Sequence, residues 1–387
     1  MSYRPSKNVV LLGLTSLFND LSSEMILSVL PAFFLSVLKA GASSLGLVEG
    51  LAEGASNLIK VYSGRFSDRW QRRKPFVLYG YLLSVITRPA YLLVQRVAGV
   101  VGLRVLDRVG KGFRDSPRDA LISLSTPKEE TGRAFGFHRA FDTVGAIIGP
   151  LIAYLILRAY PAGFHIVFVT SFLAGVFAVL SVLFIKDIAG KVERKNIPLT
   201  SLAAFSENFK RYLLSLFFLS LGSIPIAVLL LKTQSIGLVL ASIPLFYLLY
   251  NLSYAGFSFS AGKMSDRIGA KKVIAAGYLL LIAGYALLAM AENTMILIIG
   301  FLVLGMFPAL TDGVQRALAS ELSSEEKRGS ALGYVNAISG IGLLLAGIGG
   351  GYVWQQFGVL YALTLAGIFV LVGLAILSGV SRTRITG

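Results

Sequence analysis

The chain reads Gly64-Arg-Phe-Ser-Asp68-Arg69-Trp-Gln-Arg72-Arg73-Lys74, and 198 residues later it reads Gly262-Lys-Met-Ser-Asp266-Arg267-Ile-Gly-Ala-Lys271-Lys272. Each copy follows one long apolar stretch and precedes another. The spacing is about half of the 387 residues, which is typical of an internal duplication. A charged hairpin at the same place in both halves predicts two related bundles of apolar helices.

The composition places these helices in a membrane. Apolar residues make up 55% of the chain and charged residues 14%, and the mean hydropathy is +0.74, whereas soluble domains carry roughly 25% charged residues. Apolar runs of about 20 residues, long enough to cross a bilayer, recur from end to end. We count twelve, near 9–37, 43–63, 75–95, 98–122, 133–157, 163–185, 209–231, 235–261, 272–290, 295–320, 329–353 and 359–380.

The net charge of +16 predicts the orientation of the chain rather than a nucleic-acid partner. If the N-terminus is cytoplasmic, most Lys and Arg residues fall in cytoplasmic segments, and the outer segments hold only Lys39, Arg96, Arg158 and Lys232. Such a bias is typical of the cytoplasmic side, where basic residues face anionic lipid headgroups. We therefore expect a multi-pass protein of the cell (cytoplasmic) membrane, surrounded by lipid, with both termini cytoplasmic and no nucleic-acid partner.

A second repeat supports the duplication. Gly132-Arg-Ala-Phe-Gly136-Phe137 matches Gly329-Ser-Ala-Leu-Gly333-Tyr334 at an offset of 197 residues. Residues 188–208 are polar and read as a cytoplasmic linker. The predicted domains are therefore an N-terminal six-helix bundle over 1–187, this linker, and a C-terminal six-helix bundle over 209–387.

At these motifs the chain resembles the major facilitator superfamily over essentially its whole length. The hairpin is similar to that family's signature loop, Gly-x-x-x-Asp-Arg-x-Gly-Arg-Arg, with Gln71 where the second glycine is usual and Gly269 keeping it in the second copy. Gly145-Ala-Ile-Ile-Gly149-Pro150 is similar to the motif of the superfamily's antiporters, and departs from it afterwards at Ala153 and Tyr154. The resemblance implies an all-α integral membrane fold with 12 transmembrane helices in two six-helix bundles, and drug/proton antiport by alternating access.

The resemblance also implies a gate latch on the cytoplasmic side. Asp68 would meet the start of the eleventh span, and Asp266 the start of the fifth, where helix N-termini attract carboxylates. The alternative is that the basic residues of the hairpins only anchor these loops or snorkel to the interface. The candidate latch residues are Gly64, Asp68, Arg69, Arg118, Gly262, Asp266, Arg267 and Arg316.

Ionisable residues inside the spans are the second group of candidates, because charges at membrane depth are costly and mark pathways or paired networks. Asp20 and Glu24 are four residues apart and share a helix face. Arg104 and Arg108 have the same spacing and need acidic partners; the family's architecture implies that spans one and four line the cavity, so we expect Asp20 and Glu24 in that role. His138 is isolated and reads as structural. The candidates for proton coupling or the substrate cavity are Asn19, Asp20, Glu24, Glu49, Glu53, Arg88, Arg104, Asp107, Arg108, Lys111, Arg139, Asp142, Tyr250, Tyr254 and Asp312.

These groups predict a proton-coupled secondary active transporter of a small amphipathic organic solute, and the resemblance of the Gly-Pro motif to that of the antiporters implies that the solute is exported. A carboxylate pair that alternates between buried and solvated environments can load and release a proton; the alternative for the charges is a static salt-bridge network. Two other functions stay open: transport of a metal cation or other hydrophilic ion held by Asn19, Asp20 and Glu24, and an uncoupled lipid flippase or scramblase. We expect no cofactor, with the proton gradient as energy source, no metal centre, no enzyme activity and a monomer, and the chain has no cysteine.

Overall fold

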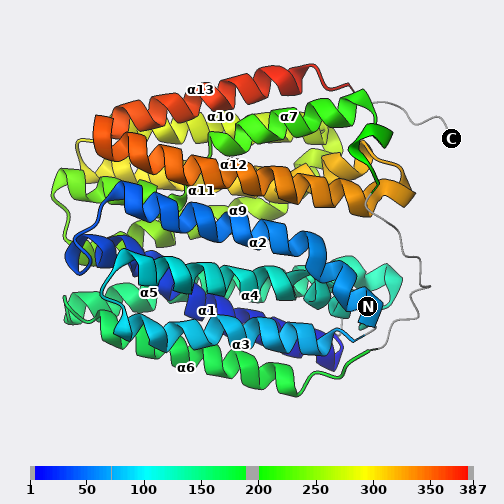
Figure 1. Ribbon diagram of the computed structural model, residues 1–387, viewed down its shortest axis with the longest axis horizontal. Coiled ribbons are helices and arrows are strands. Elements are labelled where there is room, and N and C mark those ends of the chain that lie inside the picture. The colour runs from blue at the N-terminus through cyan, green and yellow to red at the C-terminus, as the bar shows by residue number, and fades with distance from the viewer. Residues whose placement is uncertain (1–4, 71, 189–199, 382–387) are drawn as a thin grey trace. The chain divides into compact units, whose positions relative to one another are not determined.

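The computed structural model of this chain describes residues 5–70, 72–188 and 200–381, and of residues 64–70, 128 and 259 it describes only the backbone. The described residues fold into helices joined by short connections, with no strand among them. Figure 1 shows the helices as coiled ribbons coloured along the chain. The all-α fold that the sequence predicts is confirmed.

The first half of the chain holds six long helices. Their order follows the apolar runs of the sequence. Single-turn 3₁₀ helices follow α3 at Tyr91–Leu93 and α4 at Lys128–Glu130. The long helices are α1 (Lys7–Ser36), α2 (Ala42–Trp70), α3 (Lys74–Ala90), α4 (Val97–Leu124), α5 (Thr131–Ala159) and α6 (Phe164–Leu183).

The second half repeats this order with one interrupted helix. After a 3₁₀ turn at Leu202–Ala204, α7 (Glu207–Leu221) stops at Gly222 and the chain continues through Pro225, which has no N–H to extend the helix, into the short α8 (Ile226–Leu230) and a 3₁₀ helix, Leu231–Ile236. The 3₁₀ turns Leu240–Ser242 and Glu325–Lys327 precede α9 and α12. The long helices that follow are α9 (Ile243–Ile268), α10 (Ala270–Ala289), α11 (Thr294–Glu321), α12 (Arg328–Phe357) and α13 (Val359–Ser378).

The helix pairs that pack together recur in the two halves. In the first half α1 packs on α5 and α6, and α3 packs on α4 and α6. In the second half α7 packs on α12 and α13, and α10 packs on α11 and α13. Counting spans in chain order, these are the same four pairings, so the duplication that two short motifs predict extends to the packing of the helices.

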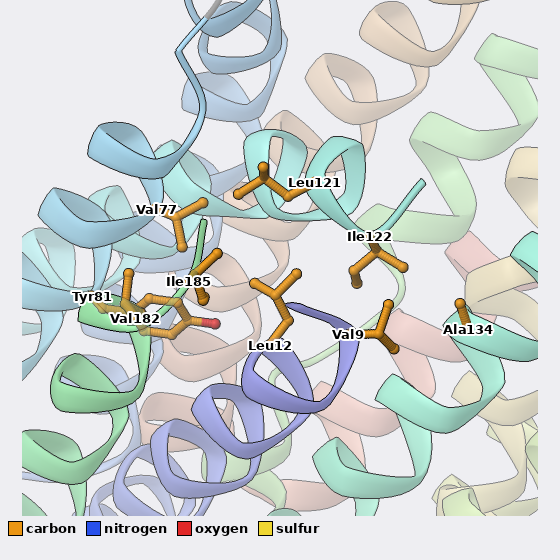
Figure 2. Packing of buried hydrophobic residues seen from close by; sticks show 9 residues of the cluster. All are labelled: Val9, Leu12, Val77, Tyr81, Leu121, Ile122, Ala134, Val182 and Ile185. Atoms are coloured by element: carbon orange, nitrogen blue, oxygen red, sulfur yellow. The ribbon is translucent and has the colours of Figure 1, made fainter. Parts of the chain in front are cut away.

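An apolar cluster lies at one end of the first-half helices, as Figure 2 shows. Val9 and Leu12 from the start of α1 meet Val77 and Tyr81 from α3, together with residues from the ends of α4 and α6. At the same end the Asn8 side chain donates to Ser125 Oγ (3.1 Å) and to the Lys186 carbonyl (2.9 Å). Starts of odd-numbered helices and ends of even-numbered helices therefore share this end, as consecutive membrane crossings require.

Ten helical segments of the described chain are long and apolar enough to cross a membrane. They correspond to ten of the twelve predicted spans. The two others, near 43–63 and 98–122, are α2 and α4, which form helices of 29 and 28 residues but are not among the ten. Both carry charged residues along their middle turns, which lowers their hydropathy, so a count of twelve spans is not confirmed by length and composition.

The backbone divides into two compact units. The first unit comprises Met1–Ala40, Leu51–Lys195 and Val239–Leu248, and the second comprises Gly41–Gly50, Asn196–Leu238 and Leu249–Gly387. The start of α2 is thus grouped with the second unit, and the start of α9 with the first. Residues 189–199 of the predicted linker lie outside the described residues, and the domain boundaries at 187 and 209 stay a prediction.

Candidate functional site

The contact between α1 and α5 brings acidic residues of the first unit together. Gly145 and Gly149 lie against α1: a Cβ on Gly149 would stand 2.7 Å from the Leu21 carbonyl oxygen, and one on Gly145 would meet the Leu17 carbonyl still more closely. Small residues at this spacing let two backbones approach. The side chains next to the glycines, including Asp20 and Asp142, are therefore held close together in what we call the α1–α5 seam.

Asp142 lies buried at the centre of this seam. It accepts a short hydrogen bond from the Ser16 hydroxyl of α1. On its own helix, Arg139 Nη1 lies 3.4 Å and His138 Nδ1 3.7 Å from its Oδ2. Arg139 reaches out of the seam, with 61% of its side chain exposed, whereas His138 is buried and its Nε2 has no hydrogen-bond partner among the described residues.

Asp20 and Glu24 continue the seam along α1. Asn19 Nδ2 donates to Asp20 Oδ1 at 3.0 Å, and the charges that act on Asp20 come from Asp142, Glu24 and Lys111 of α4. The Tyr247 hydroxyl, from the part of α9 that belongs to the first unit, donates to Glu24 Oε2. Four titratable side chains thus follow one another along two adjacent helices. They are Glu24, Asp20, Asp142 and His138.

A basic cluster occupies α3 and α4. Asp107 lies between two arginines that are fully buried: Arg88 Nη2 stands 2.9 Å from its Oδ1 and Arg104 Nη1 3.3 Å from its Oδ2. The Nε and Nη1 atoms of Arg88 are buried without an acceptor among the described residues. One carboxylate therefore faces two guanidinium groups.

Glu53 of α2 supplies the next carboxylate. Its Oε1 lies 3.2 Å from Arg108 Nη2, and 33% of the Glu53 side chain is exposed against 9% of Arg108. From the sequence we expected Asp20 and Glu24 as partners of Arg104 and Arg108; the structure places Asp107 and Glu53 in that role. Helix rotation decides this, because α4 turns these arginines towards α2 and α3, and the sequence spacing does not report that rotation.

The family of the chain can now be decided by comparison. A family model described as Major Facilitator Superfamily matches residues 12–248 and 212–384. The chain belongs to the major facilitator superfamily. It is a transporter, and the resemblance read from the hairpin and Gly-Pro motifs is confirmed at the level of the family.

Relatives of this transporter cover nearly its whole length. It is 36% identical over 367 residues to an uncharacterized MFS-type transporter of Methanocaldococcus jannaschii, covering 90% of this chain and 89% of that protein. It is 28% identical over 378 residues to the multi-drug resistance efflux pump PmrA of Streptococcus pneumoniae, covering 91% and 92%.

Two solved structures share its fold. The nucleoside transporter NupG matches with a TM-score of 0.76 at 17% identity, covering 96% of this chain and 98% of that chain. The human organic anion transporter MFSD10 (TETRAN) matches with a TM-score of 0.68 at 14% identity, covering 96% and 99%. At such low identity these likenesses show the fold of the transporter and nothing of its substrate.

The remaining cavity candidates of the transporter lie in the second unit. The Tyr254 hydroxyl approaches Asp312 Oδ2 at 3.3 Å, and Asp312 is exposed. The Tyr250 carbonyl lies against Gly305 of α11, so this residue lies at a helix contact. Glu49 is buried and belongs to the α2 segment that is grouped with the second unit. These residues are therefore described with the second unit.

The latch candidates of the transporter stay a prediction. The side chains of Gly64, Asp68 and Arg69 lie outside the described residues. Arg118 contacts Asp119 at 2.9 Å and Asp115 at 3.7 Å on its own helix, and Asp115 also lies 3.4 Å from Lys60 Nζ. The candidates of the second copy are exposed: Gly262, Asp266, Arg267 and Arg316.

Two residues gain a place in the site that the sequence analysis did not assign. His138 read as isolated, and Tyr247 was not among the candidates. The spacing of four residues between His138 and Asp142 was a usable signal, because it places both on one helix face. For Tyr247 the sequence held no signal, since its partner Glu24 is 223 residues away.

Among the described residues, no group of three or more His, Cys, Asp and Glu side chains has the geometry to hold a metal ion.

Proposed function

We propose that this transporter exports a small amphipathic organic solute across the cytoplasmic membrane in exchange for protons, by alternating access. The observation that carries the proposal is the α1–α5 seam, where Asp142 accepts from Ser16 of α1, and Asp20 and Glu24 lie against Gly145 and Gly149 of α5. Carboxylates gathered at one helix contact repel one another while they are charged. A group of this kind binds a proton readily and releases it when its surroundings change, which is what a coupling site must do.

A topology of twelve spans completes the proposal. We take α2 and α4 as the two further spans, because their charges pair with each other or with α3 inside the first unit instead of facing lipid: Glu53 with Arg108, Lys60 with Asp115, and Asp107 with Arg88. Ionisable residues of membrane helices face the bundle interior in this way. The bias of basic residues supports cytoplasmic termini, and the efflux-pump relative supports export.

The proposed cycle uses the chain's own contacts. A proton that binds at Asp20 or Glu24 removes a negative charge from the seam, which weakens the repulsion from Asp142 and alters the hydrogen bond from Tyr247 to Glu24. Because Tyr247 is on α9 and Glu24 on α1, protonation at this point acts on a contact between two helices that are far apart in the chain. Binding of the proton would therefore shift the balance between the formed and the broken state of this contact.

Proton flux in proteoliposomes tests this function. Candidate solutes are added to vesicles that contain a pH-sensitive dye, with wild type, Asp20→Asn and Glu24→Gln. We expect solute-evoked proton movement in wild type and at least a tenfold loss in each variant, since each removes one site of proton binding. Glu207→Gln, which removes an exposed carboxylate from the first turn of α7, is the matched control and should behave as wild type.

The outcomes separate the alternatives. Solute movement without proton movement, unchanged in Asp20→Asn and Glu24→Gln, would contradict proton coupling and favour the uncoupled lipid flippase or scramblase. Proton movement evoked by inorganic cations alone would instead favour the transporter of a hydrophilic ion.

A further inference from the structure

His138 is a buried titratable residue of the α1–α5 seam that has no part in the proposed cycle. Only 4% of its side chain is exposed, and its Nε2 atom is buried without a hydrogen-bond partner among the described residues. An imidazole nitrogen can donate or accept a hydrogen bond and can bind a proton. A buried polar atom without a partner costs free energy, so an apolar side chain would pack here at a lower cost than this imidazole.

Asp142 connects His138 to α1. Its Oδ1 accepts a short hydrogen bond from the Ser16 hydroxyl, and its Oδ2 lies 3.7 Å from His138 Nδ1. The second distance exceeds that of a hydrogen bond. A small change in the side-chain torsion angles would close it, because the two residues lie four apart on one helix face. One carboxylate thus contacts a hydroxyl of α1 and the imidazole of α5.

The same carboxylate also lies at the exposed face of α5. Asp142 Oδ2 is 3.4 Å from Arg139 Nη1, and 61% of the Arg139 side chain is exposed against 11% for Asp142. A charged side chain of a membrane helix faces water or the bundle interior instead of lipid. Protons can therefore reach Asp142 from the side of Arg139, and the oxygen that receives them also contacts the buried imidazole.

Charges of both signs act on the imidazole. They belong to two residues of α4 and two of α5, namely Arg118, Asp119, Asp142 and Arg139. Of the other elements that pack on α5, α6 and the turn Leu240–Ser242 have no charged residue, and α6 has the titratable His165 at its start. The charged residues of α1 and of the turn before α5 are Lys7, Asp20, Glu24, Lys128, Glu129 and Glu130. Proton binding at His138 therefore depends on whether Asp142, in contact with it, is ionised.

From these contacts we propose that Asp142 and His138 form a proton-sharing pair, in which one proton moves between Asp142 Oδ2 and His138 Nδ1. In this step the O–H bond of a protonated Asp142 breaks and an N–H bond forms on Nδ1. A neutral pair becomes a carboxylate next to an imidazolium, and the reverse step restores it. The carboxylate is a stronger acceptor for the Ser16 hydroxyl than the neutral acid is, so the position of the proton acts on the contact between α1 and α5.

This inference deepens the proposed function, because it adds a second place for a proton to the one at Asp20 and Glu24. It rests on that function only in taking the shared proton to be the one that is exchanged for the solute. The sharing itself is a property of the folded protein and needs neither a solute nor a gradient.

Nitrogen NMR of the purified protein with isotope-labelled histidine tests the inference. The chain has two histidines, and His165, at the start of α6, is exposed, so its signals serve as an internal reference. The nitrogen chemical shifts separate an imidazolium from either neutral tautomer. We expect His138 to gain a proton within the pH range in which the protein is folded. In Asp142→Asn it should bind that proton about tenfold more weakly, a change of about one pH unit, while His165 titrates as in wild type.

A matched pair of hydroxyl variants gives a second comparison in a protein that keeps Asp142. Ser16→Ala removes the donor to Asp142 Oδ1, which disfavours the carboxylate. The proton should then stay on Asp142, and the imidazolium fraction of His138 should fall. Thr15→Val is the control, because the Thr15 hydroxyl is buried on the same helix and donates to the Leu11 carbonyl at 2.8 Å. It should leave the His138 signals unchanged.

Either of two results would overturn the inference. One is a His138 that keeps a single neutral tautomer wherever the protein is folded. The other is a His138 titration that is the same in wild type, Asp142→Asn and Ser16→Ala. Because neither measurement involves transport, a shared proton in a protein without solute-evoked proton movement would leave the pair standing and reject the proposed exchange for protons.

Discussion

At the scale of single residues, one buried carboxylate compensates the positive charges of two buried arginines. Asp107 is the carboxylate shared by Arg88 and Arg104, and both arginines are fully buried. Removing one partner of a buried ion pair leaves the other charge without compensation, which costs more than the pair itself contributed. Asp107 therefore contributes to the stability of the folded protein.

We predict that Asp107→Asn destabilises the folded transporter by about 3–5 kcal/mol. The measurement is the thermal unfolding midpoint in detergent, followed by tryptophan fluorescence or by loss of monodisperse protein. Glu207→Gln breaks the exposed contact with Lys210 Nζ and should leave the midpoint unchanged, because exposed ion pairs contribute little. A similar midpoint for both variants would contradict the role given to Asp107.

A second residue-scale prediction concerns His138. Its Nδ1 lies 3.7 Å from Asp142, and the charged groups around it are Asp142 and Arg139 on α5 and Arg118 and Asp119 on α4. If the seam carries protons as far as this residue, His138→Gln should change the shape of the pH profile of transport while the protein stays folded. A lower rate with an unaltered pH profile would assign His138 a structural role.

At the scale of secondary-structure elements, glycines decide how closely α1 and α5 approach. A Cβ on Gly145 would collide with the Leu17 backbone, whereas one on Gly136, on the same helix, would meet no atom within 4 Å. The seam of titratable residues exists because these backbones are close. Spacing the helices apart would separate Asp142 from Ser16 and Asp20.

We predict opposite effects of alanine at these two glycines. Gly145→Ala should destabilise the protein by about 1–3 kcal/mol through overpacking and reduce proton-coupled flux. Gly136→Ala should be neutral or slightly stabilising, because alanine is the better helix former where space allows. The unfolding midpoint of each variant checks this, and a stable, fully active Gly145→Ala protein would show that the seam tolerates wider spacing.

At the scale of the whole molecule, the alternation of helix direction and the bias of basic residues together predict the topology. The exposed connections at the two ends of α4 provide the test, because Arg96 precedes this helix and Glu129 follows it. The chain has no cysteine, so single cysteines report accessibility without background. We expect an impermeant thiol reagent to label Arg96→Cys in intact cells, and Glu129→Cys only after permeabilisation; the reverse pattern would place the termini outside.

The sequence alone determined the membrane class, the duplication and the family, since hydropathy and repeated motifs are local properties of the chain. It also located most of the charged residues that form the candidate site, because ionisable side chains are rare in apolar segments. Two of the twelve predicted spans, α2 and α4, are not confirmed, because the charged residues that mark them as functional also lower their hydropathy.

Only the tertiary structure decided which of these charges meet. Arg108 pairs with Glu53 and Arg104 with Asp107, while Asp142 accepts from Ser16, and Glu24 accepts from Tyr247. Sequence spacing places residues on a helix face, but the rotation of each helix and the identity of its neighbours follow from packing along the whole chain. The division into an acidic seam and a basic cluster is therefore a property of the packed helices.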